Sequence, residues 1–412
     1  MNFLTSELLA NEAEHVIPMG INTLSKHRSR FPEQYPLVTV GGKGAVLWDV
    51  DRNSFVDWGG ALGANILGYG DPTIAEVVAS AIKTGCVFSL THRGEINAAR
   101  AFLKMFPGFD MVRFAKNGTD ATAGAVRLAR AITGRTKICS MGYHGYHDVF
   151  NPHASMNDGI PESLKDHIEE FSWGEFPNIN EAACVILEVP PRNRKDYEID
   201  SDYLRSLKNE TNNHGALFIL DEIVTGLRHP LNAAYQYYDI IPDIICMGKA
   251  LANGLPISVI AGKKEIMEHF NHVFFSTTFA GDIISLTAMS AVLANMSDLW
   301  EHLEYVGGNL KLKMERTAEQ HGIDLRTTGI GCRWIFDFIK DGIPDLALKT
   351  LFLEGMIQEG QLFTHAVFPT MAHDLFHVNG CSFEETFELM KEAWDEPEKF
   401  LKGRPMEGPY RR

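Results

Sequence analysis

The chain has 412 residues, 45% of them apolar and 22% charged, an ordinary globular composition with room for one large domain and a smaller one. Its formal net charge of −15 argues against nucleic acid and against an anionic membrane surface as partners. No apolar run approaches the roughly 20 residues that cross a bilayer, so we expect no membrane span.

The six cysteines are scattered and form no C-x-x-C pair, which favours reduced thiols over disulfides or a zinc site. Residues 1–17 lack a basic segment followed by a long apolar stretch, so they are not expected to be a signal peptide. Together these features predict a soluble, cytoplasmic protein.

In chain order, residues 1–50 form an irregular N-terminal segment with a hairpin-like stretch at 38–48. Residues 51–290 alternate short apolar strands with helical patterns, which predicts a large domain around a mostly parallel sheet with right-handed crossovers. The candidate strands are Met111–Ala115, Lys137–Met141, Cys184–Val189, Ala216–Leu220, Ile244–Met247 and Ile257–Ala261.

Between the first two strands, apolar residues recur at i, i+4, i+7 and i+11, so Asp120–Ile132 is predicted to be a helix with one buried stripe. Residues 291–412 are predicted to form a smaller C-terminal α/β domain. Its texture suggests helices over Ile284–Gln320 and Phe383–Phe400, with a strand over Ile330–Phe338. The expected fold class is therefore α/β.

Lys116-Asn117-Gly118-Thr119 lies between the first strand and this helix. Glycine lets backbone N–H groups approach an anion, the helix N-terminus attracts negative charge, and Thr119 adds a hydroxyl. An ordinary turn with a helix N-cap would explain the same residues. The spacing lacks G-x-G-x-x-G, which disfavours a dinucleotide site.

Gly142-Tyr143-His144-Gly145 follows the second strand. An aromatic side chain at a strand end can stack on a flat heteroaromatic ring, and flanking glycines allow a close backbone approach. A loop aromatic beside a hydrogen-bonded histidine is the alternative interpretation.

Asp221 ends one buried apolar run, and Lys249 follows another through Gly248. Two strand ends would bring a carboxylate and an amine to the edge where open α/β sheets bind ligands. A carboxylate that keeps a pyridinium protonated and a lysine that forms an imine are the groups that pyridoxal 5′-phosphate (PLP) requires. A salt bridge at a sheet edge would also explain the pair.

Seven segments, in order along nearly the whole chain, match the motifs of one enzyme family. They are Met19–Asn22 against G-G-V-N, Gly42–Asp57 against G-K-G…W-D-V-D…D, Asn117–Ala121 against S-G-T-E-A, Tyr143–Gly145 against Y-H-G, Asp221–Arg228 against D-E-V-M-T-G-F-R, Gly248–Pro256 against G-K…G-L-P, and Thr278–Gly281 against T-x-x-G. The chain resembles the class III (fold type I) PLP-dependent aminotransferases, and within them the glutamate-1-semialdehyde 2,1-aminomutases.

The resemblance implies PLP as cofactor, an α/β fold of type I, and a homodimer. Lys249 would form the internal aldimine and shuttle a proton, and Asp221 would pair with the pyridinium nitrogen. The other implied cofactor contacts are Tyr143 and Ile223 on the two ring faces, His144 of the Y-H-G motif, Asn117, Gly118 and Thr119 at the phosphate, Asn193 at the ring hydroxyl, and Thr278 reaching the phosphate of the neighbouring subunit.

Two departures from the aminomutase pattern concern the substrate. The aminomutases have an arginine shortly after V-N, where Lys26 is nearest here, inside a basic cluster (residues 26–30) that a solvated loop would explain equally well. The glutamate of their S-Q-F-E motif has no counterpart in Ala366–Pro369. Lys26 and Glu222 are the candidate substrate contacts.

Three histidines, His365, His373 and His377, lie near this C-terminal stretch, but their spacing matches no metal-ligand geometry, so no metal is predicted.

Three functions compete: an aminotransferase, an intramolecular 2,1-aminomutase, and a non-catalytic protein of the PLP fold. Lys249 and Asp221 argue against the third, because a protein without catalysis needs neither. The departures favour the first. We therefore expect an amino-acid donor and a small aldehyde or keto acceptor as partners, and neither nucleic acid nor membrane.

Overall fold

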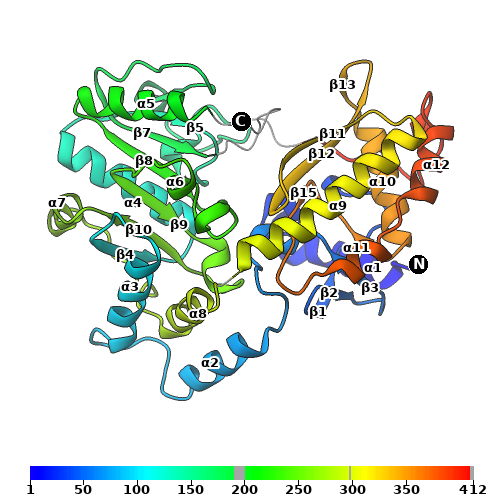
Figure 1. Cartoon of the computed structure of the whole chain (residues 1–412), viewed down its shortest axis with the longest axis horizontal. Coiled ribbons are helices and arrows are strands. Elements are labelled where there is room, and N and C mark those ends of the chain that lie inside the picture. Colours follow the sequence, from blue (N-terminus) through cyan, green and yellow to red (C-terminus); the bar gives the residue numbers. More distant parts are fainter. Residues whose placement is uncertain (190–199, 297, 409–412) are drawn as a thin grey trace. The chain divides into compact units, whose positions relative to one another are not determined.

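The computed structural model describes residues 1–189, 200–296 and 298–408. These residues divide into two compact units: a large unit of residues 72–300, and a small unit of residues 1–71 together with residues 301–408 (Figure 1). The pattern of strands and helices in the sequence predicted domain boundaries between residues 50 and 51 and between residues 290 and 291 instead. The assignment of the cofactor to residues 51–290 stays a prediction.

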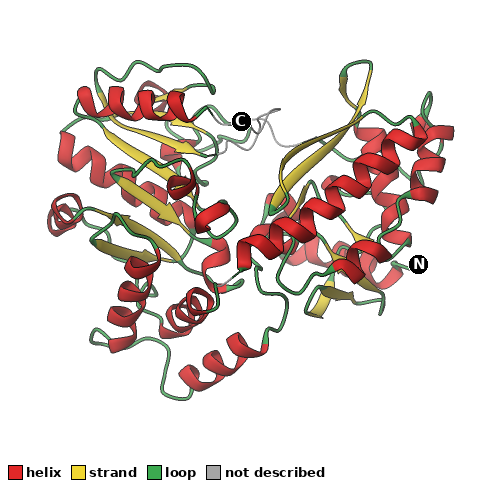
Figure 2. Cartoon of the chain, in the orientation of Figure 1, coloured by secondary structure: helices red, strands yellow, loops and turns green. Residues whose placement is uncertain are grey.

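The large unit is built around a seven-stranded sheet in the order β4-β10-β9-β8-β7-β5-β6. Figure 2 shows its strands in yellow and the surrounding helices in red. From β9 to β6 all neighbours pair in parallel, whereas β10 is antiparallel to both β9 and β4. The strands are β4 (Met111–Ala115), β5 (Lys137–Met141), β6 (Ile168–Glu170), β7 (Ala182–Glu188), β8 (Leu217–Glu222), β9 (Ile244–Met247) and β10 (Ser258–Gly262). The predicted mostly parallel sheet is confirmed.

Continuous apolar runs explain the central strands, because β7 and β9 are buried along their whole length. β4, β5 and β9 have the predicted bounds, and β7, β8 and β10 begin or end one or two residues away from them. The sequence did not reveal β6, a three-residue strand at the sheet edge.

Helix α4 (Gly118–Thr133) packs across the sheet and contacts β4, β10, β9, β8 and β7. It contains the predicted helix 120–132, and its buried stripe includes Ala121, Ala125 and Leu128. The other helices of the large unit are α2 (Pro72–Ile82), α3 (Arg93–Met105), α5 (Ser201–Asn213), α6 (Ala234–Tyr237), α7 (Lys264–Met267) and α8 (Ile283–Ala294).

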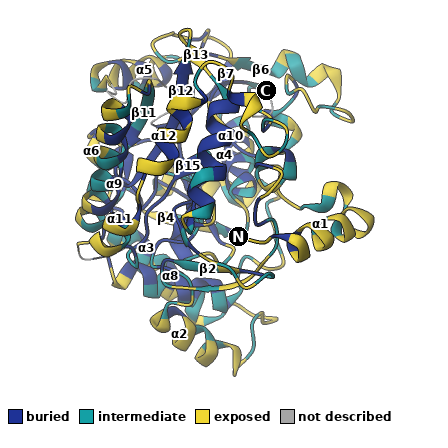
Figure 3. Cartoon of the chain, turned by 90° about the vertical axis from the view of Figure 1, so that its right-hand side faces the viewer, coloured by how far each residue is buried: buried dark blue, intermediate teal, exposed yellow. Residues whose placement is uncertain are grey.

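The small unit has two sheets, in the orders β1-β2-β3-β14 and β11-β12-β13, with β15 pairing with β12. The strands are β1 (Thr39–Lys43), β2 (Val46–Asp49), β3 (Ser54–Asp57), β11 (Leu325–Ile330), β12 (Arg333–Lys340), β13 (Ile343–Pro344), β14 (Gln361–Leu362) and β15 (Ala366–Val367). β1 and β2 form the predicted hairpin. Figure 3 shows exposed residues along α1 and buried residues along α10. The helices are α1 (Leu4–Val16), α9 (Leu299–His321, which begins in the large unit), α10 (Leu346–Gln358), α11 (Leu375–Gly380) and α12 (Glu384–Glu392).

Two element predictions in the C-terminal part were wrong. Ile330–Phe338 is not one strand, because the chain reverses between β11 and β12, where Ile330 pairs with Arg333. Helix α12 ends at Glu392 instead of reaching Phe400, and Pro397 opens a separate short turn. The helical segments predicted over Ile284–Gln320 are confirmed, as the two helices α8 and α9.

In the described part of the chain, no single helix combines the length and apolar character needed to cross a membrane; only α8 and α9 taken together, sharply bent at their junction, satisfy the same criterion.

Candidate active site

Asp221 and Lys249 leave two adjacent parallel strands at the same edge of the sheet of the large unit. In the register of β8 and β9, Asp221 pairs with Cys246 and Glu222 pairs with Met247, and Lys249 follows two residues later. The expected adjacency of these strand ends is confirmed. A carboxylate and an amine therefore meet at the carboxyl edge, where such sheets bind ligands.

The Asp221 carboxylate is buried, at 2% exposure, and both of its oxygens have partners. Nδ1 of His144 lies 2.7 Å from Oδ2, and Oδ1 accepts the backbone N–H of Ile223 at 3.0 Å. Nε2 of His144 is buried and meets no hydrogen-bond partner among the described residues. If Nδ1 carries the proton, His144 donates to Asp221 and fixes the direction of the carboxylate.

Lys249 stands at a strained point of the backbone. Its φ is +44°, a left-handed value that costs a side-chain-bearing residue on the order of 1–3 kcal/mol. Gly248 before it is pressed between Ile223 and the carbonyl of Ile257, 3.2 and 3.3 Å from the position of an added Cβ. Strain at this point of the chain is typical of a functional residue.

The first turn of α4 lies at the same edge of the sheet, where it packs against Ile223. A Cβ on Gly118 would lie 2.8 Å from Cγ2 of Ile223, so glycine is required for this close approach. The N–H groups of Gly118 and Thr119 have no acceptor within the described part of the chain. Two such N–H groups at the start of a 16-residue helix are suited to binding an anion.

The segment after β5 packs on this turn. Gly145, at φ +114°, touches Thr119 so closely that an added Cβ would collide with the threonine side chain. The Thr119 hydroxyl accepts the N–H of His147 at 3.3 Å, and Thr122 donates its hydroxyl to the carbonyl of His144. The structure therefore brings together the two motifs that the sequence could interpret only separately.

Tyr143 follows Gly142 at the end of β5 and is 41% exposed. Gly142 lies against Glu188, the last residue of β7, at 3.0 Å from an added Cβ to Cβ of the glutamate. Because Glu188 pairs with Asp221 in the register of β7 and β8, Tyr143 belongs to the same edge.

Glu222 is buried, and its carboxylate has other hydrogen-bond partners than that of Asp221. Its carboxylate accepts the backbone N–H groups of Ala234 and Tyr235, each at 2.8 Å, and the hydroxyl of Thr225 at 3.3 Å. Burial raises its pKa to about 7, against these hydrogen bonds, which lower it. Neighbouring side chains of a strand point to opposite faces, so Asp221 and Glu222 have different surroundings. Its contacts give Glu222 a role in holding the loop that follows.

The structure gives little information on the remaining predicted site residues. Thr278 is exposed in the turn that precedes α8. Lys26 is exposed in a short helical turn of the small unit. Asn193 lies outside the described residues.

The C-terminal histidines have protein partners. His373 is buried, lies against Trp58 with 4.4 Å between ring centroids, and pairs through Nδ1 with the Thr370 hydroxyl at 2.9 Å. Nδ1 of His377 lies 2.7 Å from Asp374. Among the described residues there is no group of histidine, cysteine and carboxylate side chains that could hold a metal.

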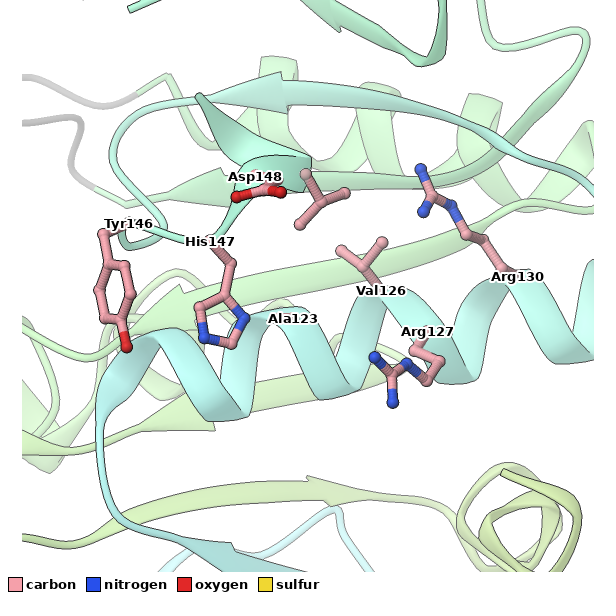
Figure 4. A pocket seen from close by; sticks show the side chains of 8 residues that line it. Ala123, Val126, Arg127, Arg130, Tyr146, His147 and Asp148 are labelled. Carbon is pink, nitrogen blue, oxygen red and sulfur yellow. The ribbon is translucent and has the colours of Figure 1, made fainter. Parts of the chain in front are cut away.

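A pocket of about 390 Å³ lies elsewhere in the large unit (Figure 4). Helix α4 and the segment 146–149 form its walls, with Arg127, Arg130 and His147 among the lining side chains. No predicted site residue lines it, so the candidate active site rests on the strand ends and the first turn of α4.

Comparison with known proteins identifies the family of this constellation. The family model for class III aminotransferases matches residues 29–178 and 149–357. A glutamate-1-semialdehyde 2,1-aminomutase of Alkaliphilus metalliredigens is 28% identical, with 96% of this chain and 98% of the relative covered. Another protein of that name, from Francisella philomiragia, is 32% identical over 80% of this chain and 82% of the relative.

Among solved structures, the PLP internal aldimine form of the FumI protein from Sphingopyxis sp. MTA144 is similar, with a TM-score of 0.88 and 25% identity. The similarity covers 96% of this chain and 99% of that one.

Proposed function

The chain belongs to the class III aminotransferase family, whose members are PLP-dependent enzymes, and from this premise we propose that it transfers an amino group between an amino-acid donor and a small carbonyl acceptor. The observation that carries the proposal is the arrangement of Asp221 and Lys249 on adjacent parallel strand ends, beside the free N–H groups of α4.

The residues at this edge fit the cofactor. Two unpaired backbone N–H groups and the Thr119 hydroxyl suit a phosphate. A buried carboxylate held by His144 suits a protonated ring nitrogen, and Gly118 and Gly248 pack closely on Ile223, which fixes that side chain at the same edge. Asn117 and Tyr143 stand at the same edge, and Asn193 remains an expectation for the ring hydroxyl.

Each residue has a distinct task in this account. Lys249 would hold the cofactor through Nζ and would take and return the proton at the substrate carbon. Asp221 keeps the ring nitrogen protonated, and His144 keeps Asp221 in position. When bound, the cofactor supplies an electron sink for the charge that develops on the substrate. Tyr143 and Ile223 would lie on its two faces.

We also propose a homodimer in which Thr278 completes the phosphate site of the partner subunit. Phe274 and Phe279, close to Thr278 in the chain, are 85% and 61% exposed. Exposed aromatic side chains beside a polar turn are typical of an interface. An obligate interface of this kind buries more than about 2,000 Å². Sedimentation should give a dimer, and a fully active monomer would contradict this part of the proposal.

An intramolecular 2,1-shift is the second candidate function, because curated relatives along most of the chain are named glutamate-1-semialdehyde 2,1-aminomutase. The segment that would carry their glutamate is apolar here: Phe368 is buried against Gly60 and Gly63. Lys26 also lacks the planar fork with which arginine binds a carboxylate. Both differences favour transfer between two molecules.

An isotope experiment separates the two functions. The holoenzyme is incubated with a panel of ¹⁵N-labelled amino acids and carbonyl acceptors, and the label is followed by mass spectrometry. We expect the nitrogen to appear in a product made from the acceptor. Sustained formation of 5-aminolevulinate from glutamate-1-semialdehyde, without a second donor or acceptor, would overturn the proposal in favour of the mutase.

A further inference from the structure

Lys116, the residue directly before the phosphate-binding turn Asn117–Thr119, joins three segments of the large unit. Its side chain is 15% exposed, and its ammonium forms an ion pair with the Asp282 carboxylate. The same Nζ donates to the carbonyl of Pro256 at 3.0 Å and lies 3.2 Å from the hydroxyl of Ser285. One charge therefore connects the end of β4, the segment after Lys249 and the start of α8.

Asp282 is the N-cap of α8 and directly follows the turn Thr278–Gly281. Its Oδ1 accepts the N–H groups of Ile284 at 3.0 Å and Ser285 at 3.3 Å, while Oδ2 meets Lys116. Burial by itself would raise the pKa of Asp282, but the hydrogen bonds from Lys116 and Ser285 hold it below its usual value. The carboxylate is therefore ionised at neutral pH and fixed from both sides.

Further contacts brace the two turns that this ion pair connects. Ser258 donates its hydroxyl to the carbonyl of Asn117 at 2.7 Å. Gly281 lies against the Glu95 carboxylate, about 3.0 Å from an added Cβ. Because neither turn can shift without breaking these contacts, a displacement of one is transmitted to the other.

We infer that Lys116 and Asp282 are positioning residues that lock the turn Asn117–Thr119 to the turn Thr278–Gly281 of the same subunit. This inference rests on the proposed function, in which the first turn serves the subunit's own site and the second serves the partner's site. The pair then sets the affinity for the cofactor phosphate in both sites of the dimer.

The test compares Lys116→Met, Asp282→Asn and the double variant with a matched control, Lys137→Met. Lys137 forms a comparable ion pair with Glu169 in the same unit, with side chains 25% and 31% exposed, but stands at the opposite end of its strand. Dissociation constants for PLP and for inorganic phosphate are measured by titration of the cofactor-free protein, alongside thermal unfolding.

Each single variant at Lys116 or Asp282 should weaken both ligands about tenfold, and the double variant should be no weaker than the worse single variant. Lys137→Met should leave both constants within about twofold of the wild type while lowering the unfolding temperature. Unchanged constants in Lys116→Met, or an equal loss in the control, would overturn the inference.

Hybrid dimers test the action on the partner's site. A wild-type subunit is paired with one that carries Lys249→Ala and Asp282→Asn, so that only the wild-type subunit binds PLP covalently. We expect the affinity of that single site to fall relative to a hybrid carrying Lys249→Ala alone. Normal affinity would overturn the coupling between sites. A monomeric wild-type chain would refute the proposed dimer together with this coupling, whereas the Lys116→Met titration tests the subunit's own site in either case.

Discussion

His144 and Asp221 form a buried pair, with Nδ1 of the imidazole 2.7 Å from Oδ2 of the carboxylate across 77 positions of sequence. The contact fixes one oxygen, and the N–H of Ile223 fixes the other. A carboxylate that cannot rotate presents its charge in one direction, so Asp221 is organised before any ligand binds.

Asp221→Asn should keep the fold and lose about 100- to 1,000-fold in kcat, because it removes the proposed electrostatic partner of the ring nitrogen. Asp243→Asn is the control: Asp243 is a partly buried aspartate, it accepts the N–H of Phe218 at 2.7 Å, and it precedes β9 at the opposite edge. Steady-state kinetics should show the control near normal turnover. Equal activities of the two variants would refute the role of Asp221.

Gly118→Ala should weaken PLP binding about tenfold, because the new methyl group would press on Ile223 at the turn that we propose binds the phosphate. Gly124→Ala places a comparable clash on the same helix, against Phe275 and Ile260, away from that turn. The control should lose stability and keep its PLP affinity. PLP is titrated into both cofactor-free variants to measure its affinity. Equal affinities of the two variants would contradict the assignment of this turn to the cofactor site.

The site could be predicted from sequence only where local patterns carry it. Unbroken apolar runs located the strands that end near Asp221 and Lys249, and a short glycine-containing turn located the start of α4. The pairs His144–Asp221 and Lys116–Asp282 join residues 77 and 166 positions apart, and no local periodicity in the sequence predicts such contacts.

Local sequence patterns also fail to predict two features of the fold. β14 pairs in parallel with β3, so the N-terminal residues share a sheet with residues beyond 360. The turn between β11 and β12 lies inside an apolar stretch that resembles one strand. Local sequence composition predicts neither feature, because both depend on which distant segment pairs with the strand.

Glu222 predicts a pH dependence of stability. Its pKa is raised to about 7 in the fold from an ordinary 4.5, so the folded chain binds the proton more tightly than the unfolded chain. Its contribution is therefore fully present below about pH 4.5 and is lost as the pH rises through about 7, up to roughly 3 kcal/mol. Glu222→Gln removes this dependence.

Thermal unfolding of wild type and Glu222→Gln at several pH values between about 4.5 and 8 provides the measurement. The wild type should lose stability relative to the variant as the pH rises. A difference between the two proteins that stays constant over this range would contradict the raised pKa.

The central claim is that Lys249 binds the cofactor, and borohydride reduction of the holoenzyme followed by peptide mapping tests it most directly. Reduction makes the bond between lysine and PLP permanent, so mass spectrometry identifies the residue that carries it. We predict one pyridoxyl label per chain, on Lys249. A label on another lysine, or none on a protein loaded with PLP, would contradict the account.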